Sequence, residues 1–188
     1  MRIHFLLVSA LAVEMLAAPA WAQRHRDPLT QTEISQIRDT SWEPKLRLPL
    51  YVQFARDRLV RLEQLRADPK TKDRAKQTHD LLDDFQLLYD ELNDNIDTYV
   101  DRRDDIRKPL KIVIDADTEF QAKLRALRDA AGVSVAEASE YEFVLTNAIE
   151  TVDGAVDDHR KLLSDQEEQA KHKMLNKNPS KGTGVSPE

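Results

Sequence analysis

The 188-residue chain contains no cysteine and only 4 glycines. The absence of cysteine excludes disulfide frameworks, cysteine zinc sites, thiol nucleophiles and iron–sulfur clusters. Two of the glycines, Gly182 and Gly184, lie close to the C-terminal end, and neither a G-x-G-x-x-G nor a G-K-[ST] motif occurs. Because phosphate-binding turns depend on such glycines, we do not expect a Rossmann or P-loop nucleotide-binding domain.

Long apolar runs are also scarce. One run, from Phe5 to about Ala18, follows a basic start and precedes Ala20-Trp21-Ala22. This combination is typical of a secretory signal peptide, and the run is too short to span a bilayer as a helix. We therefore expect residues 1–22 to be removed near Ala22, which leaves a periplasmic or secreted chain without a transmembrane segment. The alternative is a short N-terminal anchor that is not cut.

Aromatic residues make up only 6% of the chain, whereas charged residues make up 33%. Mean hydropathy is −0.60. This composition is typical of a charged helical protein rather than a β-sandwich or an α/β enzyme. The net charge of −6 argues against nucleic acid as the main partner.

Helix boundaries are well marked in the first half of the chain. Thr30 and Glu33 form a capping-box pattern, which predicts a helix from there to about residue 40. A second helix is predicted over 44–66, where apolar residues recur at spacings of three and four. Asp68-Pro69 then indicates a turn.

The next segment carries a heptad seam over residues 70–131. Apart from Arg103 and Asp117, the seam positions are apolar, and the pattern keeps its phase through Pro109. The positions are Leu82, Phe85, Tyr89, Leu92, Ile96, Tyr99, Arg103, Ile106, Leu110, Val113, Asp117, Phe120, Leu124, Leu127 and Ala131. We favour one long helix kinked at Pro109. The alternative is two separate helices.

A last helix is predicted from Ser134 to about Met174. Gly132 allows a left-handed cap, and Ser134 with Glu137 repeats the capping-box pattern. The expected fold is all-α: an elongated antiparallel bundle of three to four long helices with coiled-coil-like packing. We divide the chain into a signal peptide (1–22), a flexible leader (23–29), a single bundle domain (30–175) and a disordered tail (176–188).

Charge is distributed unevenly among these helices. Residues 44–66 are mainly basic, whereas residues 79–101 contain Asp and Glu but no Lys or Arg. Opposite charges beside apolar seams favour antiparallel pairing of these two helices. Residues 134–170 are again acidic, with Arg160 and Lys161 as the basic exceptions.

Few residues are candidates for a binding site, and none forms a recognisable catalytic or cofactor motif. His79 and Asp83 are i, i+4 neighbours that could hold a metal ion, and His159 lies on the seam of the last helix. Each also has a simpler interpretation, as a solvated pair or as a hydrogen-bonded core residue. Arg103 and Asp117 need partners if buried, or they mark a break in the core. We expect no enzyme and no cofactor.

Residues 29–33, Leu-Thr-Gln-Thr-Glu, followed by Ile34 and Ile37-Arg38, resemble the LTxxQ element of Spy/CpxP-type periplasmic chaperones. Here position 33 is Glu instead of Gln, and no second copy of the element occurs. The resemblance covers about ten residues. It implies a small exported all-α protein that holds unfolded clients or tunes an envelope-stress sensor.

Three functions follow from these observations. The first is a non-catalytic interaction scaffold or adaptor in the periplasm, with protein partners or a second copy of itself. The second is a holdase-type chaperone or envelope-stress sensor. The third is a metal- or cofactor-binding helical bundle, based on His159 and the acidic segments.

Overall fold

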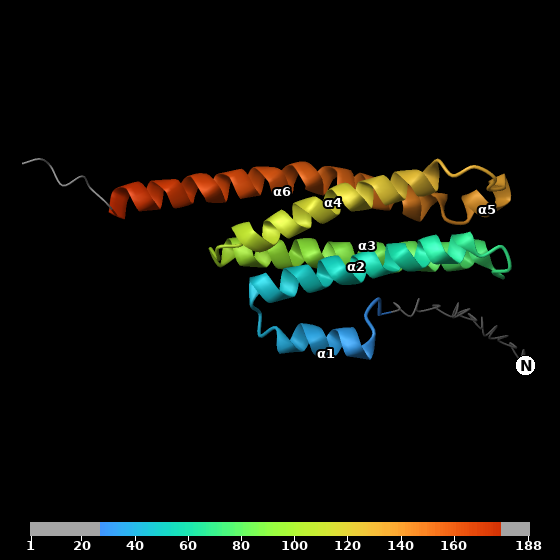
Figure 1. The fold of residues 1–188 in the computed structure, drawn as a ribbon, viewed down its shortest axis with the longest axis horizontal. Helices are drawn as coiled ribbons and strands as arrows, with labels where there is room; N and C mark the ends of the chain where they lie inside the picture. Colours follow the sequence, from blue (N-terminus) through green and yellow to red (C-terminus); the bar gives the residue numbers. More distant parts are fainter. Residues whose placement is uncertain (1–26, 178–188) are drawn as a thin grey trace, which may run out of the picture.

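The computed structural model describes residues 27–177, and every regular element in this range is a helix (Figure 1). The six helices pack against one another, so the predicted all-α class is confirmed. They are α1 (Gln31–Asp39), α2 (Pro44–Ala67), α3 (Arg74–Asp101), α4 (Arg107–Arg128), α5 (Val135–Ser139) and α6 (Glu142–Lys177). The predicted signal peptide lies outside the described residues, as do most of the predicted leader and tail.

The four longest helices run along the molecule in alternating directions (Figure 1). Helix α2 packs against α3 and α4, and α6 packs against α4 and α3. The consecutive helices α3 and α4 are not neighbours, so the chain crosses the bundle diagonally between them. The pairs α2/α3 and α4/α6 are therefore antiparallel, and the pairs α2/α4 and α3/α6 are parallel (Figure 1).

Helix α1 begins with the predicted capping box. The Glu33 amide donates to Thr30 Oγ1 at 3.3 Å, and the Thr30 amide donates to Glu33 Oε2 at 2.7 Å. These bonds satisfy two amides that the first turn of a helix leaves free. After α1, Ser41 and Trp42 take positive φ values of 48° and 63°, which turns the chain back into α2.

The predicted pairing of basic α2 with acidic α3 is found. The two helices lie side by side over most of their length (Figure 1). Across this interface, Arg47 Nε donates to Asn95 Oδ1 at 2.7 Å. The apolar stripes of both helices face inward, because Leu59 and Leu92 are each almost fully buried.

The prediction of one long helix over 70–131, kinked at Pro109, is wrong. Helix α3 ends at Asp101 and α4 begins at Arg107. Arg103 takes a left-handed conformation with φ of 61°, its amide bonds to Val100 O, and the Asp104 amide bonds to Tyr99 O. These two bonds make a Schellman motif, which ends a helix even though the left-handed residue here is arginine instead of glycine.

The heptad seam over residues 70–131 keeps its phase although the helix is not continuous. Both helices bury their apolar stripe in the same core, and Ile106 in the connection is itself fully buried. Pro109 lies in the first turn of α4, where its missing amide costs no helical hydrogen bond. Gln166 of α6 fastens the connection: its Oε1 accepts from the Ile106 amide, and its Nε2 donates to Asp104 O.

The predicted last helix is also interrupted, after Ser139. Ser134 Oγ accepts from the Glu137 amide at 3.1 Å, as expected. The Glu137 carboxylate does not complete the box, because it pairs with Arg74 at 2.7 Å and Arg66 at 3.4 Å. Tyr141, directly before α6, is buried. The short helix α5 is thus held to the end of the bundle where α2 ends and α3 begins, and α6 starts after it at Glu142.

Candidate functional site

Three polar side chains from three helices meet inside the bundle. Asp117 on α4 accepts a hydrogen bond from Tyr89 Oη on α3 at 2.7 Å through Oδ1. Its Oδ2 lies 2.8 Å from Nδ1 of His159 on α6. Tyr89 and Asp117 are fully buried, and His159 is only 5% exposed. We call these residues the polar triad.

The polar triad explains why a charged residue, Asp117, lies on a mainly buried seam. A buried carboxylate is costly unless it is paired and hydrogen-bonded, and Asp117 has a partner on each oxygen. Burial, the charge of Asp117 and its hydrogen bond raise the pKa of Tyr89 far above its usual value. Tyr89 therefore stays protonated and donates. Arg103, the other charged seam residue, is exposed at the break between helices.

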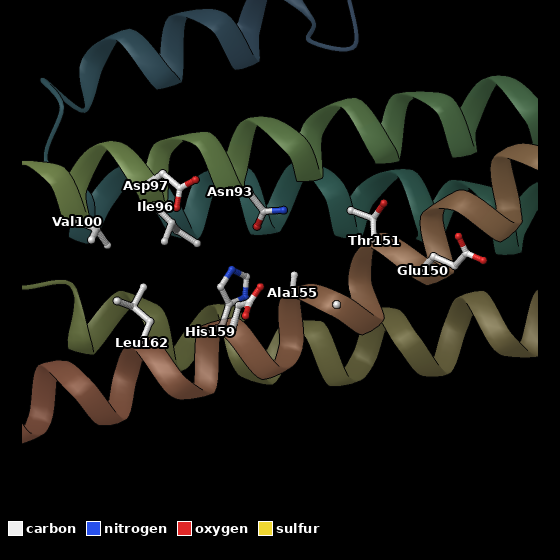
Figure 2. A pocket seen from close by; sticks show the side chains of 11 residues that line it. Asn93, Ile96, Asp97, Val100, Glu150, Thr151, Ala155, His159 and Leu162 are labelled. Carbon is white, nitrogen blue, oxygen red and sulfur yellow. The ribbon is translucent and has the colours of Figure 1, made fainter.

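Beside the polar triad, a groove of about 570 Å³ opens between α3 and α6 (Figure 2). We call it the α3/α6 groove. His159 belongs to its wall, so the imidazole links the buried carboxylate to the surface. Figure 2 shows the His159 ring pointing from α6 toward α3. Nδ1 is occupied by Asp117, and no protein group in the described chain bonds Nε2.

The walls of the α3/α6 groove combine apolar and acidic side chains. Acidic residues come from both helices: Asp97, Glu150 and Asp158. The apolar lining consists of Ile96, Val100, Ala155 and Leu162. Asn93 Oδ1 is buried at the groove without a hydrogen-bond partner. No Lys or Arg lines this groove.

A buried ion pair elsewhere in the bundle packs α1 against α2. Arg58 donates to both Glu33 carboxylate oxygens, at 2.6 and 2.8 Å, and to the Pro28 carbonyl. Burial alone would raise the pKa of Glu33, but the hydrogen bonds from Arg58 and Thr30 outweigh it and lower the pKa to about 2. Arg58 thus holds the capped start of α1 against α2. Neither Arg58 nor Glu33 lines the α3/α6 groove.

The structure places His159 apart from the other two predicted candidates, His79 and Asp83. His159 joins the polar triad, whereas His79 and Asp83 lie exposed on the outer side of α3. The nearest carboxylate to His79 is Asp80, at 3.9 Å from Nδ1. Within residues 27–177, no three His, Asp or Glu side chains are close enough together to hold a metal ion.

Sequence reasoning missed Tyr89, Asn93 and the acidic residues of the groove. Tyr89 was counted as an apolar seam residue, and its hydroxyl is what makes it part of the site. One signal was available: Asp117 and His159 are polar residues on two seams that are otherwise apolar except at Arg103. Two such exceptions on different helices are candidates for pairing with each other.

Comparisons of this chain with protein-family models, with curated proteins and with solved structures found no match. Among the helices within residues 27–177, none combines the length and the apolar character needed to cross a membrane.

Proposed function

We propose that the protein is an exported, non-catalytic interaction scaffold that binds a protein partner through the end of α6. The observation that carries the proposal is an exposed helix end. From Lys171 to Asn176 every side chain is exposed, and Figure 1 draws α6 continuing past the other long helices. We call residues 171–176 the α6 tip.

The α6 tip carries two adjacent large apolar residues. Met174 and Leu175 are each 69% exposed, beside the basic residues Lys171 and Lys173. Single exposed apolar residues are common, but two on a projecting helix end that packs against nothing are an available contact surface. Methionine is enriched at protein interfaces, where its flexible side chain adapts to a partner. The basic neighbours favour an acidic partner surface.

The interior polar groups support a non-catalytic role. The polar triad and the Arg58–Glu33 pair each connect different helices, so their hydrogen bonds are used to hold the fold. The proposal also takes the four longer helices as one elongated, coiled-coil-like bundle in solution. X-ray scattering that gives a compact, near-spherical envelope would contradict this part.

The partner is tested by crosslinking in the cell. A photo-crosslinking amino acid at Leu175 is expected to give a discrete adduct with one partner. The matched control is the same amino acid at Phe143, which is 79% exposed but lies at the other end of α6. The double variant Met174→Ser/Leu175→Ser is expected to remove partner recovery while leaving the melting temperature unchanged, because neither side chain is buried.

Each other result assigns a different function. Many unrelated adducts that increase under unfolding stress favour the holdase-type chaperone. An adduct of the chain with itself favours a homo-oligomer. Equal adducts from Leu175 and Phe143, or none from either, contradict the α6 tip as the binding surface.

Export is tested separately, by N-terminal sequencing of the mature protein from the periplasmic fraction. We expect the sequence to begin at Gln23, after cleavage at Ala22. A mature chain that begins at Met1 would contradict cleavage and favour the uncut anchor.

A further inference from the structure

We propose that Arg66 and Arg74 form a carboxylate-binding site, that Glu137 occupies it as an internal ligand, and that an acidic segment of a partner protein displaces Glu137 together with α5. We call the two arginines the arginine pair. They lie at the end of the bundle where α2 ends and α3 begins, whereas the α6 tip projects from the opposite end (Figure 1). The site therefore does not depend on the function proposed for the α6 tip.

The arginine pair holds Glu137 in the way that arginines hold an anionic ligand. Arg74 donates from Nε and Nη2 to the two carboxylate oxygens of Glu137, at 2.9 and 2.7 Å. This two-pronged arrangement is how arginine binds carboxylates with defined geometry. Arg66, in the last turn of α2, adds a bond from Nη1 at 3.4 Å. Two guanidinium groups from two helices thus converge on one carboxylate.

The arginine pair keeps its position without help from Glu137. Arg66 Nη1 donates to Tyr141 Oη at 3.4 Å, and the guanidinium lies 5.7 Å from the centre of the tyrosine ring. Tyr141 is only 3% exposed, so this support is well packed. Arg74 belongs to the first turn of α3, and α3 packs along α2. When Glu137 leaves, two positive groups remain close together, and their repulsion favours another anion between them.

The beginning of α3 also favours an anion. This helix has no side-chain cap and no acidic residue in its first turn, where Arg74 is basic. The N-terminal end of a helix carries a partial positive charge, so a base there is unfavourable and an external carboxylate is favourable. The Glu137 carboxylate now provides that negative charge from α5.

Helix α5 is weakly attached to the rest of the bundle. None of its residues is buried. Within the described chain, the side-chain hydrogen bonds from residues 130–140 to α2 and α3 all come from Glu137, and Val133 adds a partly buried apolar contact. Gly132, with φ of 80°, precedes α5, and a break between Ser139 and Glu142 follows it. The segment between these two points can move while α4 and α6 stay packed.

The turn beside the arginine pair is basic, which favours an acidic partner. Residues 70–76 contain Lys70, Lys72, Arg74 and Lys76, with Asp73 as the one acid. Lys70 and Lys72 are exposed. Exposed charges of one sign attract a segment of the opposite sign and raise its rate of association.

Replacing Glu137 by an external carboxylate exchanges one set of ion pairs for another. Glu137 has the advantage of being tethered, which gives it a high effective concentration at the arginine pair. The parent chain is therefore expected to bind an acidic segment weakly. A variant without the Glu137 charge is expected to bind it more tightly, because the internal competitor is gone.

The test uses the mature protein and, as the probe, a fluorescently labelled peptide with the sequence of residues 132–140. Fluorescence anisotropy at low ionic strength measures binding. The Glu137→Gln protein is expected to bind the probe at least about tenfold more tightly than the parent chain does. The same peptide carrying Glu137→Gln is the control probe, and it is expected to bind more weakly.

Matched variants locate the site. Glu140→Gln, which removes a charge from an exposed position two residues before α6, is expected to bind the probe like the parent chain. In the Glu137→Gln protein, Arg74→Gln is expected to abolish the gain. Arg128→Gln, at an exposed arginine that pairs with Asp129 at 2.9 Å, is expected to keep it.

Amide hydrogen exchange tests the attachment of α5 without any probe. Exchange of residues 133–139 is expected to accelerate in Glu137→Gln and to stay at the parent rate in Glu140→Gln. Unchanged exchange in Glu137→Gln would mean that Glu137 does not fasten α5, which contradicts the proposal.

Three binding results also overturn it. They are equal binding of the probe by Glu137→Gln and the parent chain, an equal gain from Glu140→Gln, and a gain that survives Arg74→Gln. Loss of the partner adduct at the α6 tip has no bearing on these results, so the two proposals fail independently.

Discussion

Helix α6 packs against two long helices, α4 and α3, and the two interfaces differ in charge. Against α4, opposite charges face each other: Arg125 pairs with Asp153 at 2.8 Å, and Lys111 pairs with Glu167 at 2.9 Å. Against α3, carboxylates stand on both sides and a groove remains open. Ion pairs therefore bridge the α4/α6 interface, whereas the α3/α6 interface contains an open groove.

The comparison shows how one acidic helix can serve two purposes. Its carboxylates are neutralised where the neighbour is basic, and they stay unpaired where the neighbour is acidic. The polar triad lies where the two interfaces meet, because Asp117 belongs to α4, Tyr89 to α3 and His159 to α6. One of its hydrogen bonds joins α6 to α4 and the other joins α3 to α4, so Asp117 links the three helices.

Removing the centre of the polar triad is expected to have the largest effect on both interfaces. Asp117→Ala leaves Tyr89 and His159 buried without their partner, and we expect a loss of about 3–5 kcal/mol in the free energy of unfolding. Urea denaturation followed by circular dichroism measures it. The control is Asp117→Leu combined with Tyr89→Phe and His159→Leu, which replaces all three polar side chains by apolar ones and is expected to recover most of the loss. A single variant as stable as the parent would show that the triad does not hold the interfaces.

Acidification is expected to weaken the buried ion pair between Arg58 and Glu33. Glu33 has a folded-state pKa of about 2, below its usual 4.5, so its stabilising effect is complete above pH 4.5 and is lost as the pH falls toward 2. The loss amounts to at most about 3 kcal/mol.

This prediction is measured as unfolding free energy against pH. The variant Glu33→Gln is expected to reduce the slope of the curve between pH 4.5 and 2, because it removes one of the carboxyl groups whose pKa is lowered in the folded state; Asp105, with a pKa of about 2, is another. If Glu33→Gln keeps the parent slope, the Arg58–Glu33 pair is not the source of the acid sensitivity.

The two glycines within the described bundle are expected to respond in opposite directions. Gly154→Ala should stabilise the protein by about 1 kcal/mol, because alanine is the better helix former and its Cβ meets nothing. Gly132 has φ of 80°, so Gly132→Ala should destabilise by about 1–2 kcal/mol. Thermal unfolding of both variants measures the difference. A destabilised Gly154→Ala would mean that the groove wall is packed more tightly than the structure indicates.

Charge changes at the two α6 interfaces are expected to have the smallest effects. Arg125→Met removes an exposed pair with Asp153 and should cost about 0.2–1 kcal/mol. Glu150→Lys places a base opposite the acids of α3 and should raise stability by less than about 1 kcal/mol. Both effects should shrink at high salt. If Arg125→Met and Glu150→Lys lower the free energy of unfolding equally, the α4/α6 and α3/α6 interfaces do not differ in charge as described.

Several features of the fold were predictable because they depend on neighbouring residues. The Thr30–Glu33 capping box, the end of α2 before Asp68-Pro69 and the positive φ of Gly132 are local properties of the chain. The break between α3 and α4 corresponds to the alternative of two separate helices, not to the favoured single helix. Its Schellman motif uses Arg103 where glycine is the usual residue, and the apolar spacing continued across it.

The candidate site was predicted only in part, for a similar reason. His159 and Asp117 stood out as polar positions on apolar seams, but nothing in their spacing shows that they meet. Their sequence separation of 42 residues spans the end of α4, the loop, α5 and half of α6. Asn93 and Glu150 have no sequence signal at all, because they matter only through the groove beside them.

The sequence by itself determined that the chain is helical, which residues form the apolar stripes and where α1, α2 and α5 begin. These properties follow from hydrophobic spacing and capping, which act within a few turns. The tertiary structure alone decided that α3 and α4 lie diagonally, that Tyr89, Asp117 and His159 share one hydrogen-bonded cluster, and that a groove opens beside it. Such contacts depend on which helices become neighbours, and an apolar stripe specifies burial without naming its partner.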